Sequence, residues 1–209
     1  APARQPDDAG APLLEEEGRT AAPLDTLTRD LTRLARAGKL QPAVGRDKEY
    51  FEILQILTRK TKNNIMLVGE ASVGKTQLVE GVAWHMARRT PAASGAPAFR
   101  VLELNLAALM AGTQYRGAFE ARLLALLDQL KQSPDAILFI DEAHLIMGAG
   151  AVEGDGMDLA NLLKPALARG EIRCIAATTL TEYRKFVERD PAIERRFQMV
   201  RVEELSVEA

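Results

Sequence analysis

Residues 69–76, GEASVGKT, form a complete phosphate-binding motif of the pattern G-x-x-x-x-G-K-S/T. A short apolar run at 65–68 leads directly into the motif, and apolar residues recur at helical spacing from Leu78 to Met86. This order of strand, loop and helix is the context that the motif requires, because the loop amides and the helix N-terminus then point at the same phosphate groups. The sequence therefore predicts a binding site for a nucleoside triphosphate.

The loop itself supplies the predicted ATP-binding residues. Gly69 and Gly74 permit the tight backbone path, Lys75 would reach the β- and γ-phosphates, and the Thr76 hydroxyl would bind Mg²⁺. The alternative is an accidental match in a chain rich in Gly and Ala, which the flanking strand and helix disfavour. The predicted set comprises Gly69, Glu70, Ala71, Ser72, Val73, Gly74, Lys75, Thr76 and Gln77.

Two adjacent carboxylates follow a second apolar run. Residues 136–140 read AILFI, and Asp141 and Glu142 come directly after them. Ligands of open α/β sheets bind at the carboxyl ends of the strands. We therefore predict that Asp141 holds Mg²⁺ and that Glu142 activates the attacking water as a general base. A solvated strand end is the alternative, and the phosphate-binding motif upstream disfavours it.

Short apolar strands alternate with helices along the chain, which predicts an α/β fold whose parallel sheet is covered on both faces. Leucines at helical spacing predict a first helix that begins at the N-cap Asp25 and ends at Gly38. The other predicted helices lie around 50–57, 78–86, 119–130, 157–169 and 181–188. The predicted strands are 65–68, 101–104, 136–140, 172–177 and 198–202.

Composition limits the partners of the chain. Its 209 residues suit one domain, and its net charge of −2 gives no electrostatic reason to expect nucleic acid. No apolar run is long enough to cross a membrane. Cys174, the only cysteine, falls in an expected buried strand, which suits a reducing cytoplasm. Neither histidine, His85 or His144, has a partner at zinc-ligand spacing.

From residue 24 to residue 208 the chain resembles the AAA+ ATPases, in particular the first ATPase module of Clp-type unfoldases and disaggregases. The matching strings are LARAGKLQPAVGRDKE, TRKTKNNIMLVGE, GTQYRGAFEAR, ILFIDEAH, NLLKPALARGEIRCIAATTLTEYRKF and ERRFQMV. The resemblance implies a three-layer P-loop fold with a five-stranded parallel sheet between helices. It also implies an ATPase that needs ATP and Mg²⁺ and forms a homo-hexamer. Unfolded or assembled proteins would be threaded through its pore, with a possible protease or adaptor as partner.

The resemblance assigns roles to six further residues. Val44 and Gly45 would cradle the adenine, Thr179 would contact the γ-phosphate or the attacking water, and Arg195 and Arg196 would reach the nucleotide of a neighbouring subunit. Tyr115 would line the central pore and grip the translocating polypeptide. From the residues alone, the two arginines also fit a solvated basic pair, and the tyrosine also fits a side chain packed on the core.

The chain departs from the family pattern at four positions. Ser72 stands where the family usually has Gly in the phosphate loop, Gln114 replaces a basic residue, and Ala118 and Ala121 replace acidic ones. We expect residues 1–23, rich in Ala, Pro, Asp, Glu and Gly, to be a flexible linker. We expect residues 24–209 to be the large subdomain without the small helical lid. A nucleotide-dependent assembly scaffold with weak or lost hydrolysis is the alternative function.

Overall fold

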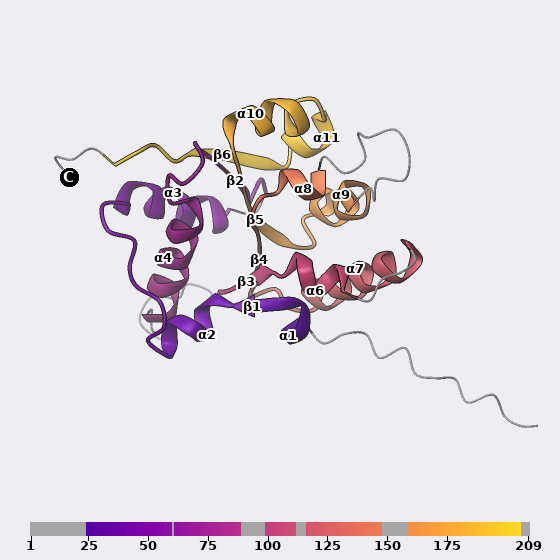
Figure 1. The fold of residues 1–209 in the computed structure, drawn as a ribbon, viewed down its shortest axis with the longest axis horizontal. Coiled ribbons are helices and arrows are strands. Elements are labelled where there is room, and N and C mark those ends of the chain that lie inside the picture. Colours follow the sequence, from indigo (N-terminus) through magenta and orange to yellow (C-terminus); the bar gives the residue numbers. More distant parts are fainter. Residues whose placement is uncertain (1–23, 60, 89–98, 112–115, 148–158, 206–209) are drawn as a thin grey trace, which may run out of the picture.

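The computed structural model describes residues 24–59, 61–88, 99–111, 116–147 and 159–205. Within these residues, six strands form one sheet in the order β1-β3-β4-β5-β2-β6 (Figure 1). The strands are β1 (Thr28–Asp30), β2 (Asn64–Val68), β3 (Arg100–Leu104), β4 (Ala136–Ile140), β5 (Arg173–Thr178) and β6 (Phe197–Arg201). Strands β2 to β6 run parallel, which confirms the five predicted strands, and the short β1 pairs antiparallel with β3 at the edge.

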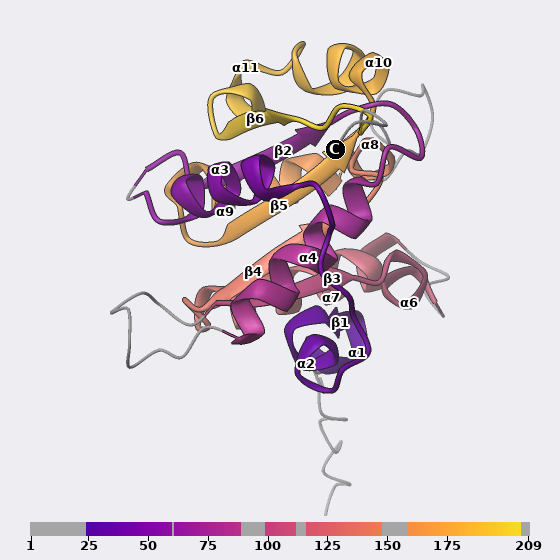
Figure 2. The same cartoon turned by 90° about the vertical axis from the view of Figure 1, so that its left-hand side faces the viewer.

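Helices cover both faces of the sheet, because alternate side chains of each strand point to opposite faces. Ile65 and Leu67 pack with α2 (Leu31–Arg36), α3 (Asp47–Leu57) and α4 (Lys75–Arg88), two of which, α3 and α4, lie in front of the sheet in Figure 2. Met66 and Val68 pack with the opposite layer. That layer contains α6 (Leu106–Met110), α7 (Arg116–Lys131), α8 (His144–Met147) and α9 (Leu159–Arg169). The predicted three-layer arrangement is confirmed.

The predicted first helix is interrupted, so this part of the prediction is wrong. Helix α1 (Leu24–Leu27) ends where β1 begins, and α2 starts only after Asp30, whose side chain accepts a hydrogen bond from the Arg33 amide at 2.8 Å. The cap is therefore Asp30 rather than Asp25. Pairing with β3 outweighs helical propensity over the three residues of β1. Gly38, at φ +72°, ends the helical segment as predicted.

The segment after β5 is also more divided than expected. The predicted helix 181–188 consists of a short turn, α10 (Leu180–Glu182), followed by a π-helical turn, η1 (Tyr183–Val187). Helix α11 (Pro191–Glu194) then leads into β6, and Asp190 caps it by accepting hydrogen bonds from two amides. Cys174 is buried in β5, as predicted. In the part of the chain that the structure describes, no helix is long and apolar enough to cross a membrane.

Candidate functional site

The phosphate-binding motif connects β2 to α4, which confirms the predicted strand, loop and helix. Gly69 lies where no side chain fits, because a Cβ there would come within 2.3 Å of the Val202 carbonyl oxygen. Gly74 adopts φ +93°, a conformation that residues with a side chain rarely adopt. The backbone of the loop therefore depends on both glycines.

Lys75 is buried at the start of α4, with 7% of its surface exposed. Its Nζ donates hydrogen bonds to the carbonyl oxygens of Gly69 and Glu70, at 2.9 and 2.8 Å. A buried ammonium group needs such partners, since its desolvation is otherwise costly. The carbonyl groups of the loop thus hold the Lys75 ammonium group at the position where an anionic phosphate would bind.

Thr76, in α4, and Asp141 meet although the strands that precede them, β2 and β4, are not neighbours. The Thr76 hydroxyl donates a hydrogen bond of 2.6 Å to Oδ2 of Asp141. Strand β5 lies between β2 and β4, so the contact forms above the carboxyl end of the intervening strand. A hydroxyl and a carboxylate oxygen are ligands that suit Mg²⁺, and the pair fits the predicted metal position.

Glu142 follows Asp141 in a strained conformation. Its φ is +49°, in the left-handed region that costs a residue with a side chain about 1–3 kcal/mol. Its backbone N–H donates to Oδ1 of Asp141 at 3.0 Å. The Glu142 side chain is 55% exposed. The carboxylate therefore lies at the open end of the site, accessible to water.

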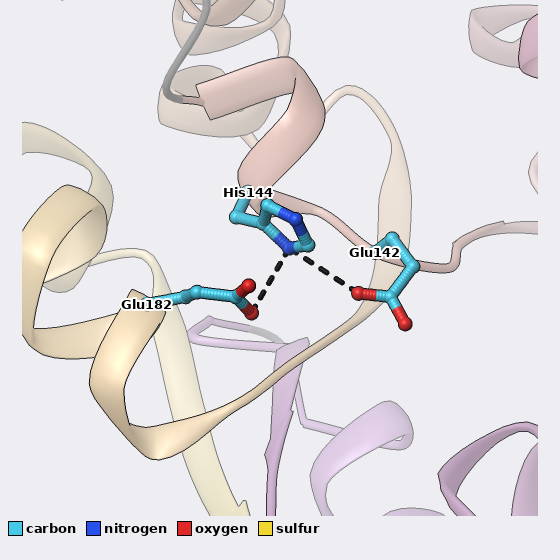
Figure 3. A group of neighbouring side chains, drawn as sticks. All are labelled: Glu142, His144 and Glu182. Atoms are coloured by element: carbon cyan, nitrogen blue, oxygen red, sulfur yellow. Dashed lines mark ion pairs between the residues drawn. The ribbon is translucent and has the colours of Figure 1, made fainter. Parts of the chain in front are cut away.

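His144 lies between Glu142 and Glu182, a contact that sequence spacing did not reveal (Figure 3). Its Nδ1 is 3.3 Å from Oε2 of Glu142 and 3.0 Å from Oε2 of Glu182. Oε2 of Glu182 also accepts hydrogen bonds from the Thr178 hydroxyl and the Thr179 amide, both at 3.1 Å. Burial favours a higher pKa for Glu182, but these hydrogen bonds and His144 outweigh it, so the pKa lies below its ordinary value.

Thr179, the expected γ-phosphate contact, follows β5 and caps α10. Its hydroxyl oxygen accepts a hydrogen bond from the Glu182 amide at 3.3 Å, while the Glu182 carboxylate accepts from the Thr179 amide. This reciprocal capping box fixes the backbone at the end of β5. Strand β5 is the neighbour of both β2 and β4, so Thr179 belongs to the same edge of the sheet as the phosphate loop and Asp141.

A pocket of about 260 Å³ lies beside the phosphate loop. It is lined by Val68, Gly69, Glu70, Val73, Leu180, Arg201, Val202, Glu203 and Glu204. Val44 and Gly45, the expected adenine contacts, are not among the lining residues, and Val44 is 80% exposed. Gly45 lies close to Leu205, because a Cβ there would come within 3.3 Å of that side chain.

Arg46 ties the turn at Val44 and Gly45 to this pocket, a role that its position in the sequence did not reveal. The buried guanidinium donates to the carbonyl oxygens of Glu203 and Val73, at 2.7 and 2.8 Å, and pairs with Glu49 at 2.8 Å. One side chain therefore connects the turn, the phosphate loop and the segment after β6.

Arg195 and Arg196 lie far from the phosphate loop of their own chain. They precede β6, whose opposite end leads to the nucleotide-side pocket, and five strand residues span about 16 Å. Both are exposed, and they line a hollow of about 460 Å³ together with two further cations, Lys62 and Arg169. An ion pair of 2.6 Å between Lys164 and Asp190 joins α9 to the cap of α11, just before the arginines.

Ser72 adopts φ +63°, so the position where the family usually has Gly does require the left-handed conformation. Replacing Ser72 with Gly is expected to raise the free energy of unfolding by about 1 kcal/mol, because it removes the strain of a side chain in the left-handed conformation. Urea denaturation measures the change. Ser72→Ala is the matched control, because it removes the hydroxyl but keeps the Cβ. An unchanged or lower free energy of unfolding for Ser72→Gly would refute the strain argument.

The expected pore residue Tyr115 lies outside the described residues. Its assignment therefore remains a prediction that rests on the sequence. The same holds for Gln114, and for residues 1–23 as a linker.

Comparisons with known proteins agree with this site. The model of the family "ATPase family associated with various cellular activities (AAA)" matches residues 65–204. The chain is 53% identical to chaperone protein ClpB 1 of Thermosynechococcus vestitus, over 92% of this chain and 22% of that protein. It is 50% identical to the ATP-dependent Clp protease ATP-binding subunit ClpC of Staphylococcus saprophyticus, over 88% of this chain and 22% of that protein.

Solved structures give the same result. The Hsp104–ADP complex of S. cerevisiae matches with a TM-score of 0.75 and 42% identity, over 88% of this chain and 26% of that chain. The chain thus spans about a fifth of the length of the curated relatives it matches. The matched segment includes the phosphate loop, the acidic strand end and the two arginines. The chain therefore belongs to the AAA family of ATPases.

Proposed function

We propose that the chain is the ATP-hydrolysing module of a ring-shaped machine that unfolds or disaggregates proteins by pulling polypeptide through a central pore. The observation that carries the proposal is the convergence of the phosphate loop with the acidic strand end, where Thr76 and Asp141 are 2.6 Å apart. Relatives named as chaperones and as an ATP-binding subunit of a protease support the coupling to protein substrates.

The loop binds the triphosphate of ATP. Amides of residues 69–76 surround the phosphates, and Lys75 exchanges its carbonyl partners for phosphate oxygens. Thr76 and Asp141 would hold Mg²⁺, which would supply positive charge against the phosphate oxygens. Val44 and Gly45 contact the adenine from the turn that Arg46 fixes against the phosphate loop.

Glu142 accepts a proton from the water that attacks the γ-phosphorus. The new bond joins this water oxygen to phosphorus while the bond to the β–γ bridging oxygen breaks, which releases ADP and inorganic phosphate. Thr179 contacts the γ-phosphate or the water through its hydroxyl. The Thr179 oxygen accepts from the Glu182 amide, so the hydroxyl hydrogen remains for donation.

Arg195 and Arg196 act on the nucleotide of the next subunit. Because they lie at the opposite end of β6 from the phosphate loop, they do not serve their own site. A contact between one subunit's arginines and the next subunit's nucleotide is head-to-tail, and such contacts close into a ring when the rotation between subunits permits it. We propose a homo-hexamer, with the arginines stabilising transition-state charge.

The proposed substrates are unfolded or assembled proteins, delivered by an adaptor or passed on to a protease. Tyr115 lies between Gly112 and Gly117 in the sequence, and a tyrosine at this position would offer an apolar surface that suits polypeptides of varied sequence. A cytoplasmic location completes the proposal, and the buried Cys174 thiol, whose pKa burial raises, suits that reducing compartment.

Replacing Tyr115 with Ala in the intact protein is expected to slow ATP-dependent unfolding of a model substrate by about tenfold, since the aromatic grip is lost. Loss of fluorescence from a tagged reporter protein measures unfolding, and ATP hydrolysis measured in parallel shows that the nucleotide site is intact. Tyr115→Phe is the matched control and should unfold the reporter at close to the original rate. Equal rates for the Ala variant and the original protein would contradict the pore assignment.

A further inference from the structure

The three side chains in Figure 3 come from two separate parts of the chain and meet at one atom. Glu142 and His144 lie at the end of β4 and the start of α8, whereas Glu182 ends α10. Nδ1 of His144 is within 3.3 Å of an oxygen of each carboxylate. The arrangement therefore connects the predicted general base to the segment that follows β5.

The contact requires a hydrogen on Nδ1. Ionised carboxylates only accept hydrogen bonds, so an unprotonated Nδ1 would place three acceptor atoms against one another. Nδ1 is buried, and neither carboxylate is aligned with it as a hydrogen-bond partner within the described residues. Both carboxylates nevertheless lie within reach of an Nδ1–H donor, and a rotation of the exposed Glu142 side chain would bring its oxygen into line with that donor.

Glu182 is held more firmly than Glu142. Its carboxylate accepts from Thr178 and Thr179, and its amide donates back to Thr179. Glu142, by contrast, is 55% exposed, and no other side chain of the described residues forms an ion pair with it in this structure. Glu182 thus anchors the imidazole, and the imidazole is the polar group that can fix the exposed carboxylate.

We propose that His144 is a positioning residue for hydrolysis: it orients the Glu142 carboxylate toward the attacking water and takes its own orientation from Glu182. The inference rests on the proposed role of Glu142 as the base. His144 does not touch the substrate. Its contribution is to restrict the rotamers of an exposed side chain, and proper orientation of a base is a large part of its effect on rate. The anchor at Thr178 and Thr179 links this orientation to the residue that senses the γ-phosphate.

The test compares two replacements of His144 in the intact protein. His144→Leu removes the donor, and it should lower the kcat of ATP hydrolysis by at least about tenfold while leaving the Kd for an ATP analogue within about twofold. His144→Asn places an amide N–H where Nδ1 was, and it should recover at least about a third of the original kcat. A merely structural role for His144 would not produce this split between kcat and Kd, nor the rescue by Asn.

Glu182 supplies a second, independent variant. Glu182→Gln should lower kcat by at least about threefold, and adding it to His144→Leu should cost less than about twofold more, because the two residues act through one contact. Independent, multiplicative losses would overturn the proposal, as would a Leu variant whose kcat matches the original. If His144→Leu fails to fold, the Asn and Gln variants still decide. Glu142→Gln separates the two hypotheses: if it leaves hydrolysis unchanged, the proposed function itself fails.

Discussion

Replacing Glu142 with Gln is expected to lower the kcat of ATP hydrolysis by about 10²–10⁴-fold while ATP remains bound. Glutamine keeps the shape of the side chain but cannot accept a proton from the attacking water. The phosphate loop, Lys75 and the pair of Thr76 and Asp141 are untouched by the change, so the Kd for ATP should stay within about threefold. Steady-state hydrolysis and titration with a fluorescent ATP analogue measure the two quantities.

The same variant distinguishes the proposed motor from a nucleotide-dependent scaffold. In a motor, Glu142→Gln should stay in the ATP state and retain an unfolded substrate, so that the complex survives gel filtration in ATP. A scaffold that never depended on hydrolysis would lose little by the change. Glu188→Gln, an exposed glutamate in the turn before α11, is the matched control and should behave like the original protein.

The parts of the fold that sequence predicted well are those whose signal is local. Strands β2 and β4 are buried along their whole length and read as uninterrupted apolar runs, and each leads directly into its functional residues. The prediction of one continuous first helix was wrong because the leucines of residues 24–34 keep helical spacing across β1, which separates α1 from α2. Strand β1 forms only because it hydrogen-bonds to β3, which lies more than 70 residues later in the sequence. A local sequence pattern cannot predict such a distant pairing.

The candidate site shows the same division. Lys75 and Thr76 were predicted because a motif of fixed spacing specifies them, and Asp141 and Glu142 because they directly follow an apolar strand. Arg46 and Glu182 were missed because their partners are distant in the sequence. Arg46 contacts Val73 and Glu203, and Glu182 contacts His144, only because the order of the strands brings these segments together. The sequence did contain one local signal for Glu182. A glutamate three positions after a threonine is the pattern of a capping box, so the pairing of Thr179 with Glu182 could have been predicted.

Replacing both Arg195 and Arg196 with Ala is expected to lower kcat by about 10³-fold, the usual effect of removing an arginine that stabilises a transferring phosphoryl group. The loss should leave the Kd for ATP nearly unchanged, because the arginines lie at the opposite end of β6 from the loop that binds the phosphates. Arg189→Ala, an exposed arginine just before the α11 cap, is the matched control.

If the arginines of one subunit act on the nucleotide of the next, rings assembled from two different variants should regain activity. Lys75→Ala abolishes nucleotide binding but keeps the arginines, whereas the double arginine variant keeps the nucleotide site. In a ring assembled from equal amounts of the two, about a quarter of the interfaces pair an intact site with intact arginines from the neighbour. Hydrolysis should therefore return to a measurable fraction of the original rate, although each variant alone is inactive. Arginines that served their own subunit's nucleotide could never be restored by mixing, and a mixture as inactive as its parts would rule out the head-to-tail site.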